Sequence, residues 1–189
     1  MAIKIVPTQT WYLEMTGRPV KDAFELPPGY SIEPFTISNR KSTGEEMNDS
    51  TGSMKKSYLE TYKAVGGNYN WYDRLLMPVE ELEEVLNSAN TEILYLKYEG
   101  EIAGFVEFDH SAEGETEIVY FGLTASHTGR KAGLPFLQWA INHAWQKPIN
   151  RLWLHTCDLD HPAALPLYQK AGFSVYKSEI VMQRVESRE

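Results

Sequence analysis

ETEIVYFGLTASHTGRKAGLPFLQWAINHAW, residues 115–145, holds three predicted elements in immediate succession. Residues 116–123 are rich in β-branched and aromatic side chains, which predicts a strand. Apolar residues recur at helical spacing from Leu134 to Trp145, which predicts a helix with a broad buried face. The loop between them, residues 125–133, is small, polar and basic. This arrangement favours phosphate binding, because the first N–H groups of a helix lack partners and its dipole attracts negative charge.

The loop contains neither of the two common nucleotide motifs, G-x-x-x-x-G-K-[ST] and G-x-G-x-x-G. We expect the backbone of Gly129–Gly133 to hold a phosphate group, and Arg130 and Lys131 to add positive charge. Pro135 is compatible with this, because its missing N–H falls in the first turn of the helix. The alternative is an ordinary strand–helix connection with basic surface residues.

Thr128-Gly-Arg-Lys-Ala-Gly133 resembles the acyl-CoA-binding segment of the GNAT superfamily of N-acyltransferases. In that family a strand leads into [QR]-x-x-G-x-[GA] and then a helix. Here Thr128 replaces the Gln or Arg, Lys131 replaces the first Gly, and Gly133 fits the pattern. Glu117–Leu123 is similar to the strand that precedes this segment in the family.

A second segment, His161–Phe173, resembles the family motif N-x-x-A-x-x-x-Y-x-x-x-G-F. His161 stands in place of the Asn, and the other motif residues are Ala164, Tyr168, Gly172 and Phe173. Two linked motifs are more specific than either alone, and the resemblance covers an acyl-CoA-binding core at about residues 91–185.

The resemblance implies an α/β (α+β) fold of the GNAT type, with a mixed, twisted central sheet flanked by helices, in a single domain over residues 1–189. It implies acetyl transfer from acetyl-CoA, a co-substrate, to a primary amine of an unidentified acceptor by direct attack in a ternary complex. The acceptor is a small-molecule or peptide amine, and a homodimer is compatible with the family. The implied cofactor-binding residues are Phe121, Gly122, Leu123, Thr128, Gly129, Arg130, Lys131, Ala132, Gly133, His161 and Ala164.

Two residues are implied to be catalytic. Glu117 resembles the general base found at this strand position in some family members. The alternative is that Glu117 is salt-bridged or solvated and that a chain of water molecules acts as the base. Tyr168 resembles the general acid for the departing thiolate, since a phenol has a pKa near that of a thiol; the alternative is a core Tyr. The N–H of Leu123 would stabilise the oxyanion.

His155, Cys157, Asp160 and His161 form the compact set H-T-C-D-L-D-H. The set can be read as a zinc site or as a Cys–His nucleophile pair for a ping-pong mechanism. The spacing fits no common zinc pattern, so we expect no metal. We expect His155 or Cys157 to line the acceptor pocket, and Asp160 or His161 to cap a helix or contact CoA.

Composition restricts the remaining functions. The formal net charge of −8 argues against a nucleic-acid partner. Cys157 is the sole cysteine of the 189 residues, which indicates a reducing compartment, and no segment has the run of apolar residues that a membrane helix needs. We therefore expect a cytoplasmic protein with no membrane partner. The rival functions are a non-catalytic acyl-CoA-binding or sensor module and a metal-dependent hydrolase built on residues 155–161.

The rest of the chain alternates strands and helices. Residues 38–52 are polar and turn-rich, which predicts a loop. We expect strands at 10–15 and 30–35 to form an N-terminal hairpin. The other expected elements are helices at 54–65, 78–86 and 162–171, a hairpin of strands 92–98 and 101–108, and strands at 150–156, 173–176 and 180–185.

Overall fold

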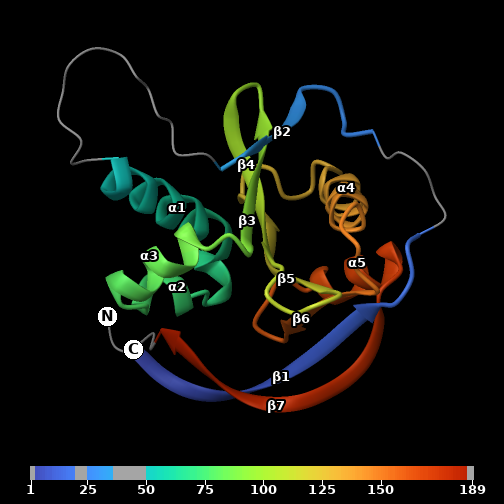
Figure 1. The fold of residues 1–189 in the computed structure, drawn as a ribbon. Coiled ribbons are helices and arrows are strands. Elements are labelled where there is room, and N and C mark those ends of the chain that lie inside the picture. Colours follow the sequence, from blue (N-terminus) through green and yellow to red (C-terminus); the bar gives the residue numbers. More distant parts are fainter. Residues whose placement is uncertain (1–2, 20–24, 36–49, 187–189) are drawn as a thin grey trace.

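The computed structural model describes residues 3–19, 25–35 and 50–186, and these form one seven-stranded sheet with helices on both faces (Figure 1). The order of the strands is β2-β3-β4-β5-β6-β1-β7. β5 and β6 are parallel and every other neighbouring pair is antiparallel, as expected for a mixed sheet. The strands are β1 (Ile3–Met15), β2 (Tyr30–Pro34), β3 (Thr91–Tyr98), β4 (Glu101–Asp109), β5 (Glu115–Leu123), β6 (Arg151–Cys157) and β7 (Ser174–Glu186).

Four of the helices fall close to the positions that the sequence predicts, and the short helices at residues 67–69 and 73–76 have no predicted counterpart. The C-terminal helix begins at Ala164, which puts Pro166 in its first turn, where a missing N–H breaks no intrahelical bond. Gly172 ends that helix with a φ of 109°. The helices are α1 (Ser50–Gly66), the 3-10 helix η1 (Gly67–Tyr69), α2 (Asp73–Leu76), α3 (Val79–Asn87), α4 (Gly133–Ala144) and α5 (Ala164–Ala171).

Each face of the sheet has its own apolar core. α4 and α5 cover one face, where Phe136, Leu137 and Ile141 are buried against Val106 and Leu154. α1 and α3 cover the other face, and the fully buried side chains there include Tyr58, Tyr62 and Phe105. Figure 1 shows these two groups of helices on opposite sides of β3, β4 and β5. Alternation along the strands separates the two cores, because successive side chains point to opposite faces.

The predicted N-terminal hairpin is wrong. β2 pairs with β3 at one edge of the sheet, whereas β1 lies between β6 and β7 near the other. β1 pairs with β7 from Ile3/Glu186 to Glu14/Ser174, so the predicted strands at 173–176 and 180–185 are one strand. Alternation predicts that a segment is a strand and which face is buried, but it does not identify the neighbouring strand.

The loop predicted at residues 38–52 can be compared with the structure only at its end. Most of the loop predicted at 38–52 lies outside the described residues, and residues 50–52 form the start of α1. The long β1–β7 ribbon curves away below the rest of the sheet in Figure 1. Among the described residues, no helix is long and apolar enough to cross a membrane.

Candidate active site

β5 and β6 separate in the middle of the sheet. Their parallel pairing runs from Glu115/Arg151 to Ile118/Leu154 and then stops, although β5 continues along β4 and β6 continues along β1. On the β4 side, Phe108 pairs with Ile118 and Glu107 with Tyr120, so Val119 is an extra residue in β5. Such a bulge bends its strand and increases the local twist. We infer that this bulge turns the end of β5 away from β6.

The open edge of β5 presents backbone groups to the gap. The N–H of Thr124 donates to the carbonyl oxygen of Ala103 at 2.9 Å, on the β4 side. Hydrogen-bonded and non-hydrogen-bonded pairs alternate in an antiparallel ladder, so the N–H groups of Leu123 and Phe121 face the opposite side, toward β6. The gap therefore has unpaired donors where the sequence predicts the oxyanion site.

A cavity of about 900 Å³ occupies this gap. Its wall includes residues from β5, the loop before α4, the start of α4, the end of β6 and α5. α1, η1 and β7 close the other side through Tyr62, Tyr69 and Gln183. The predicted site residues that line it are Phe121, Gly122, Leu123, Thr128, Gly129, Lys131, Gly133, His161, Ala164 and Tyr168.

The loop before α4 has the backbone shape of a glycine-rich segment. Gly129 has a φ of 81°, and Lys131 has a φ of 62°, the left-handed conformation that favours glycine. The family pattern has Gly at the position of Lys131. The backbone here therefore keeps the left-handed conformation although the residue is Lys instead of Gly. Arg130 is not part of the cavity wall; its guanidinium carbon lies 5.9 Å from the centre of the Tyr98 ring. Ala132 is fully buried and also lies outside the wall.

His127 anchors this loop, a role that we did not predict from the sequence. It is 7% exposed, and its Nδ1 lies 2.9 Å from the hydroxyl of Tyr30 on β2. Burial, and then the nearby charge of Arg130, lower the pKa of His127, which favours a neutral ring. A histidine in a polar loop carries no sequence signal that separates an anchor from a ligand.

Tyr168 faces the cavity from α5 and is 8% exposed. Its ring centre lies 6.3 Å from that of Phe121 on the open part of β5. Burial, and then the charge of Asp160, raise the pKa of Tyr168, so the phenol keeps its proton at neutral pH. This is the protonation state that a proton donor needs.

Glu117 is not part of the cavity wall, whereas His155 is. The Oε1 atom of Glu117 lies 3.3 Å from Nδ1 of His155. The structure therefore brings the predicted base next to a second titratable group that itself lines the cavity.

Cys157 and Asp160 have structural partners. Asp160 accepts hydrogen bonds from the Thr156 hydroxyl at 2.7 Å, the Cys157 N–H at 3.1 Å and the Trp71 indole at 3.0 Å. Burial, and then Asp160, raise the pKa of Cys157 to about 11, and its Sγ donates to Gln183 at 3.6 Å. Nδ1 of His161 accepts from the N–H of Ala163 at 3.0 Å, just before α5. Among the described residues, no group of three or more His, Cys, Asp or Glu side chains is arranged to hold a metal ion.

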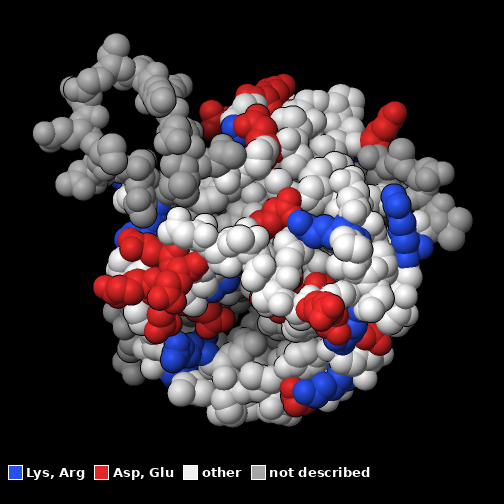
Figure 2. All heavy atoms as spheres, viewed as in Figure 1, with Lys and Arg blue, Asp and Glu red and all other residues white. Residues whose placement is uncertain are grey.

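Aromatic side chains form the wall beneath α1. Tyr62, Trp71 and Tyr120 are in mutual ring contact, with centres 4.9 to 5.6 Å apart. Asp73 is exposed at the same side of the cavity. Figure 2 shows further acidic side chains gathered over α3, whose exposed residues include Glu80, Glu81 and Glu84.

A buried ion pair supports this wall. Glu107 accepts hydrogen bonds from Arg74 at 2.5 Å and from the Tyr58 hydroxyl at 2.6 Å. Arg74 also lies over the Tyr120 ring, with 5.3 Å between its Cζ and the ring centre. We did not predict Tyr62, Tyr120 or Asp73 as cavity residues from the sequence. The helical spacing of α1 indicates burial, and burial in a core and burial in a cavity wall give the same pattern.

A comparison with curated proteins and solved structures finds acetyltransferases. Mycothiol acetyltransferase of Corynebacterium glutamicum is 26% identical over 95 residues, which are 50% of this chain and 32% of that protein. The chain thus spans about a third of the length of this relative.

Two solved structures share the fold. A GCN5-related N-acetyltransferase from Sphaerobacter thermophilus superposes with a TM-score of 0.58 at 18% identity, over 95% of this chain and 52% of that chain. A GNAT family acetyltransferase from Elizabethkingia anophelis with acetyl-CoA bound gives a TM-score of 0.53 at 18% identity, over 80% of both chains. The family model described as the acetyltransferase (GNAT) family matches residues 53–173, which include the open strand, the loop and α5. On this match, the chain belongs to the GNAT family of acetyltransferases.

Proposed function

We propose that this chain transfers the acetyl group of acetyl-CoA to a primary amine. The observation that carries the proposal is the shared cavity: the open edge of β5, the loop with Gly129 and Lys131, and Tyr168 all border it. Each feature serves a different part of a thioester, namely its pantetheine arm, its pyrophosphate and its leaving sulfur.

Acetyl-CoA binds along one wall. The N–H groups of residues 129–133 and the start of α4 hold the pyrophosphate, and Lys131 adds charge. The pantetheine arm extends along Phe121–Leu123 and takes the place of the missing strand partner. This places the thioester carbonyl close to the unpaired N–H of Leu123, which stabilises the oxyanion.

The reaction is a direct displacement at the carbonyl carbon. The lone pair of the neutral amine forms the new C–N bond, and the π electrons of the carbonyl move onto oxygen. When the tetrahedral intermediate collapses, the C–S bond breaks and the sulfur takes the electron pair. Tyr168 gives its proton to the thiolate, and a base removes the extra proton from nitrogen.

An acetylated Cys157 is not part of this mechanism. Its raised pKa of about 11 keeps the sulfur protonated at neutral pH, and the thiolate is the nucleophilic form. Both substrates are therefore bound together when the acetyl group moves, and holding the amine close to the thioester carbonyl lowers the barrier to attack.

The acceptor binds on the α1 side of the gap. Tyr62, Trp71 and Tyr120 provide aromatic surface, and the exposed Asp73 favours the approach of a cationic amine. A small molecule or a peptide with a free amine fits this description. Formation of a homodimer stays a prediction.

Calorimetric titration of acetyl-CoA tests the binding half. We expect micromolar affinity, and a loss of tenfold or more for Lys131→Glu because a charge-assisted phosphate contact is worth about 1.5 to 3 kcal/mol. Lys131→Gly is a matched control that keeps the left-handed backbone and removes only the charge, so its loss is smaller. Arg130→Glu makes the same charge change one residue away and outside the cavity wall, and we expect it to weaken binding less than Lys131→Glu.

Release of free CoA in the presence of an amine panel tests the catalytic half. The panel contains amino acids, polyamines, aminoglycosides and a peptide with a free N-terminus. Amine-dependent CoA release supports the transferase, whereas tight binding without release for any amine indicates an acyl-CoA-binding module. Absence of acetyl-CoA binding to the wild type contradicts the proposal.

A further inference from the structure

We propose that His155 is the catalytic base that removes the proton from the acceptor nitrogen, and that Glu117 is a positioning residue that acts through it. The proposal rests on the acetyltransferase function proposed above. Resemblance to the family suggested the carboxylate of Glu117 as the proton acceptor. The proposal assigns this role to the imidazole of His155 on the neighbouring strand.

The position of His155 in the sheet is the first argument. Leu154 is the last residue of β6 that pairs with β5, so His155 is the first residue beyond the point where the strands separate. Leu154 is buried on the α4 side, and alternation turns His155 to the α1 side, where the acceptor wall lies. The side chain of His155 is 42% exposed and lines the cavity.

The position of Glu117 is the second argument. Its side chain is 19% exposed, and it is not part of the cavity wall. On this geometry an acceptor amine in the cavity meets the imidazole before the carboxylate. Oε1 of Glu117 lies 3.3 Å from Nδ1 of His155, which is within ion-pair distance.

The chemistry of a carboxylate beside an imidazole follows from that contact. The carboxylate favours the tautomer with the proton on Nδ1, which leaves the lone pair of Nε2 free to accept a proton. After the amine attacks, its nitrogen in the tetrahedral intermediate is positively charged, and the N–H bond breaks as the proton moves to Nε2. The imidazolium that results is stabilised by the negative charge of Glu117.

The surroundings of His155 are consistent with this role. Tyr12 on β1 packs beside it, with ring centres 5.9 Å apart, and Lys177 of β7 lies on Tyr12 with its Nζ 4.7 Å from the ring centre. Arg151 and Cys157 are the other titratable groups on the same face of β6. Arg151 is paired with Glu14 at 2.7 Å and Glu115 at 2.9 Å, and the raised pKa of Cys157 keeps its thiol neutral. Among the described residues, Glu117 is the acidic side chain within ion-pair distance of His155.

The test compares His155→Gln and Glu117→Gln with Glu115→Gln. Glu115 is two positions before Glu117 on the same face of β5; it pairs with Arg151 at 2.9 Å and lies outside the cavity wall. With an amine accepted by the wild type, we expect His155→Gln to lower kcat about 100-fold or more, with an unchanged Kd for acetyl-CoA. Glu117→Gln lowers kcat about tenfold, as expected for a group that orients another.

A further readout separates positioning from a purely structural role. The ¹⁵N spectrum of the imidazole of His155 shows a proton on Nδ1 in the wild type and a smaller share of that tautomer in Glu117→Gln.

Three results would overturn the inference: wild-type kcat in His155→Gln, an unchanged share of the Nδ1-protonated tautomer in Glu117→Gln, or a larger loss of kcat in Glu117→Gln than in His155→Gln. The last would make Glu117 the base itself. Each of these leaves the transferase function intact. Failure of the wild type to bind acetyl-CoA or to acetylate any amine overturns both proposals together.

Discussion

The indole N–H of Trp71 donates a hydrogen bond of 3.0 Å to Oδ1 of Asp160, and so joins two segments that are 89 residues apart in the sequence. Trp71 follows η1 on the α1 side, and Asp160 lies in the turn between β6 and α5. Both residues line the cavity, so this bond connects its two walls.

Trp71→Phe removes this bond and keeps an aromatic ring. We expect the free energy of unfolding to fall by about 1 kcal/mol or more, because hydrogen bonds to charged groups are among the stronger ones. We also expect a higher KM for the amine with an unchanged Kd for acetyl-CoA, since Trp71 belongs to the acceptor wall. Trp139→Phe on α4, outside the cavity wall, is the control, and an equal rise in KM there would contradict the assignment.

Gly122 allows α1 to approach the open part of β5. A Cβ atom at Gly122 would lie 2.4 Å from Cγ1 of the buried Val65. We expect Gly122→Ala to destabilise the fold by about 1 to 3 kcal/mol, as overpacking does, measured by denaturant unfolding. Val65→Ala in the same chain should restore part of the loss, because the two positions are in contact. Gly133→Ala, whose Cβ would be 3.7 Å from its nearest neighbour, should be tolerated.

Tyr168→Phe removes the proposed proton donor and retains the ring that packs on Phe121. We expect kcat to fall about 100-fold while acetyl-CoA binding is retained, because the phenol acts when the sulfur leaves. Tyr176→Phe on β7, which lies outside the cavity wall, serves as the control. Wild-type turnover in Tyr168→Phe would show that solvent protonates the thiolate.

Cys157→Ala should retain wild-type turnover, since the thiol takes no part in the transfer. The raised pKa of about 11, against an ordinary 9.0, lowers the thiolate fraction about 100-fold, so alkylation by iodoacetamide at neutral pH should be slower by that factor than for a free thiol. Loss of activity in Cys157→Ala, together with an acetyl mass on the wild-type enzyme, would establish the ping-pong route instead.

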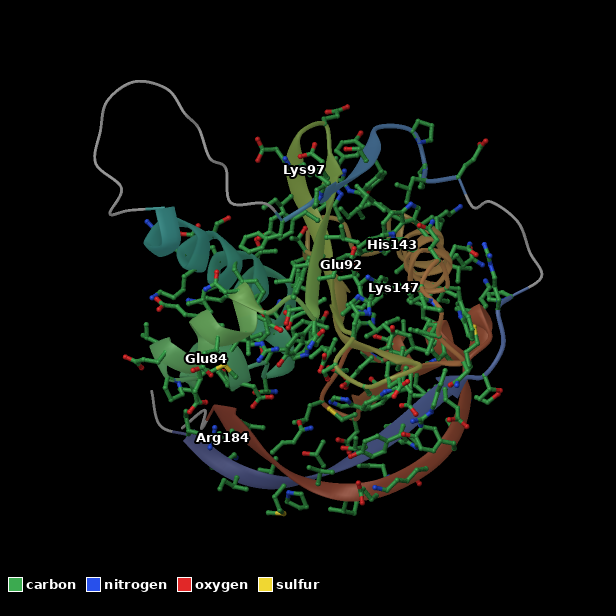
Figure 3. The ribbon with its side chains drawn as sticks, viewed as in Figure 1. Glu84, Glu92, Lys97, His143, Lys147 and Arg184 are labelled. Atoms are coloured by element: carbon green, nitrogen blue, oxygen red, sulfur yellow. The ribbon has the colours of Figure 1, made fainter. Side chains whose placement is uncertain are left out.

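Glu92 should control the stability of the fold in acid. It accepts from His110 at 2.9 Å and from His143 at 2.7 Å, with Lys147 at 3.6 Å, and Figure 3 shows His143 and Lys147 on its α4 side. The hydrogen bonds from His110 and His143 hold the pKa of Glu92 well below its ordinary 4.5.

The depressed pKa of Glu92 sets the direction of the effect. The stabilisation is fully present above pH 4.5 and is lost as the pH falls below it toward the folded-state value. The melting temperature of the wild type should therefore fall more steeply below pH 4.5 than that of Glu92→Gln. Glu33→Gln, which removes an exposed pair with Lys97, should keep the wild-type profile. Parallel wild-type and Glu92→Gln profiles would contradict the prediction.

Local sequence patterns were sufficient to predict the secondary structure at the centre of this chain. The strand, loop and helix of residues 115–145 and the helix ended by Gly172 carry their own signals: β-branched runs, helical spacing and a glycine at a left-handed helix end. The two family motifs also named the loop and Tyr168 as site residues, and both border the cavity. These features depend on residues close together in the sequence, and so they can be read from it.

Pairing between distant segments could not be read in this way. The alternation of residues 10–15 predicts a strand, but the place of β1 between β6 and β7 depends on which exposed edges remain after the other strands have paired. The same holds for Glu117 and His155, which meet because β5 pairs with β6 in a register that places Glu117 opposite Trp153, two residues before His155 on the same face. Spacing along the chain does not encode the place where two strands separate, and so the neighbours of Glu117, Arg130 and Trp71 follow from three-dimensional packing alone.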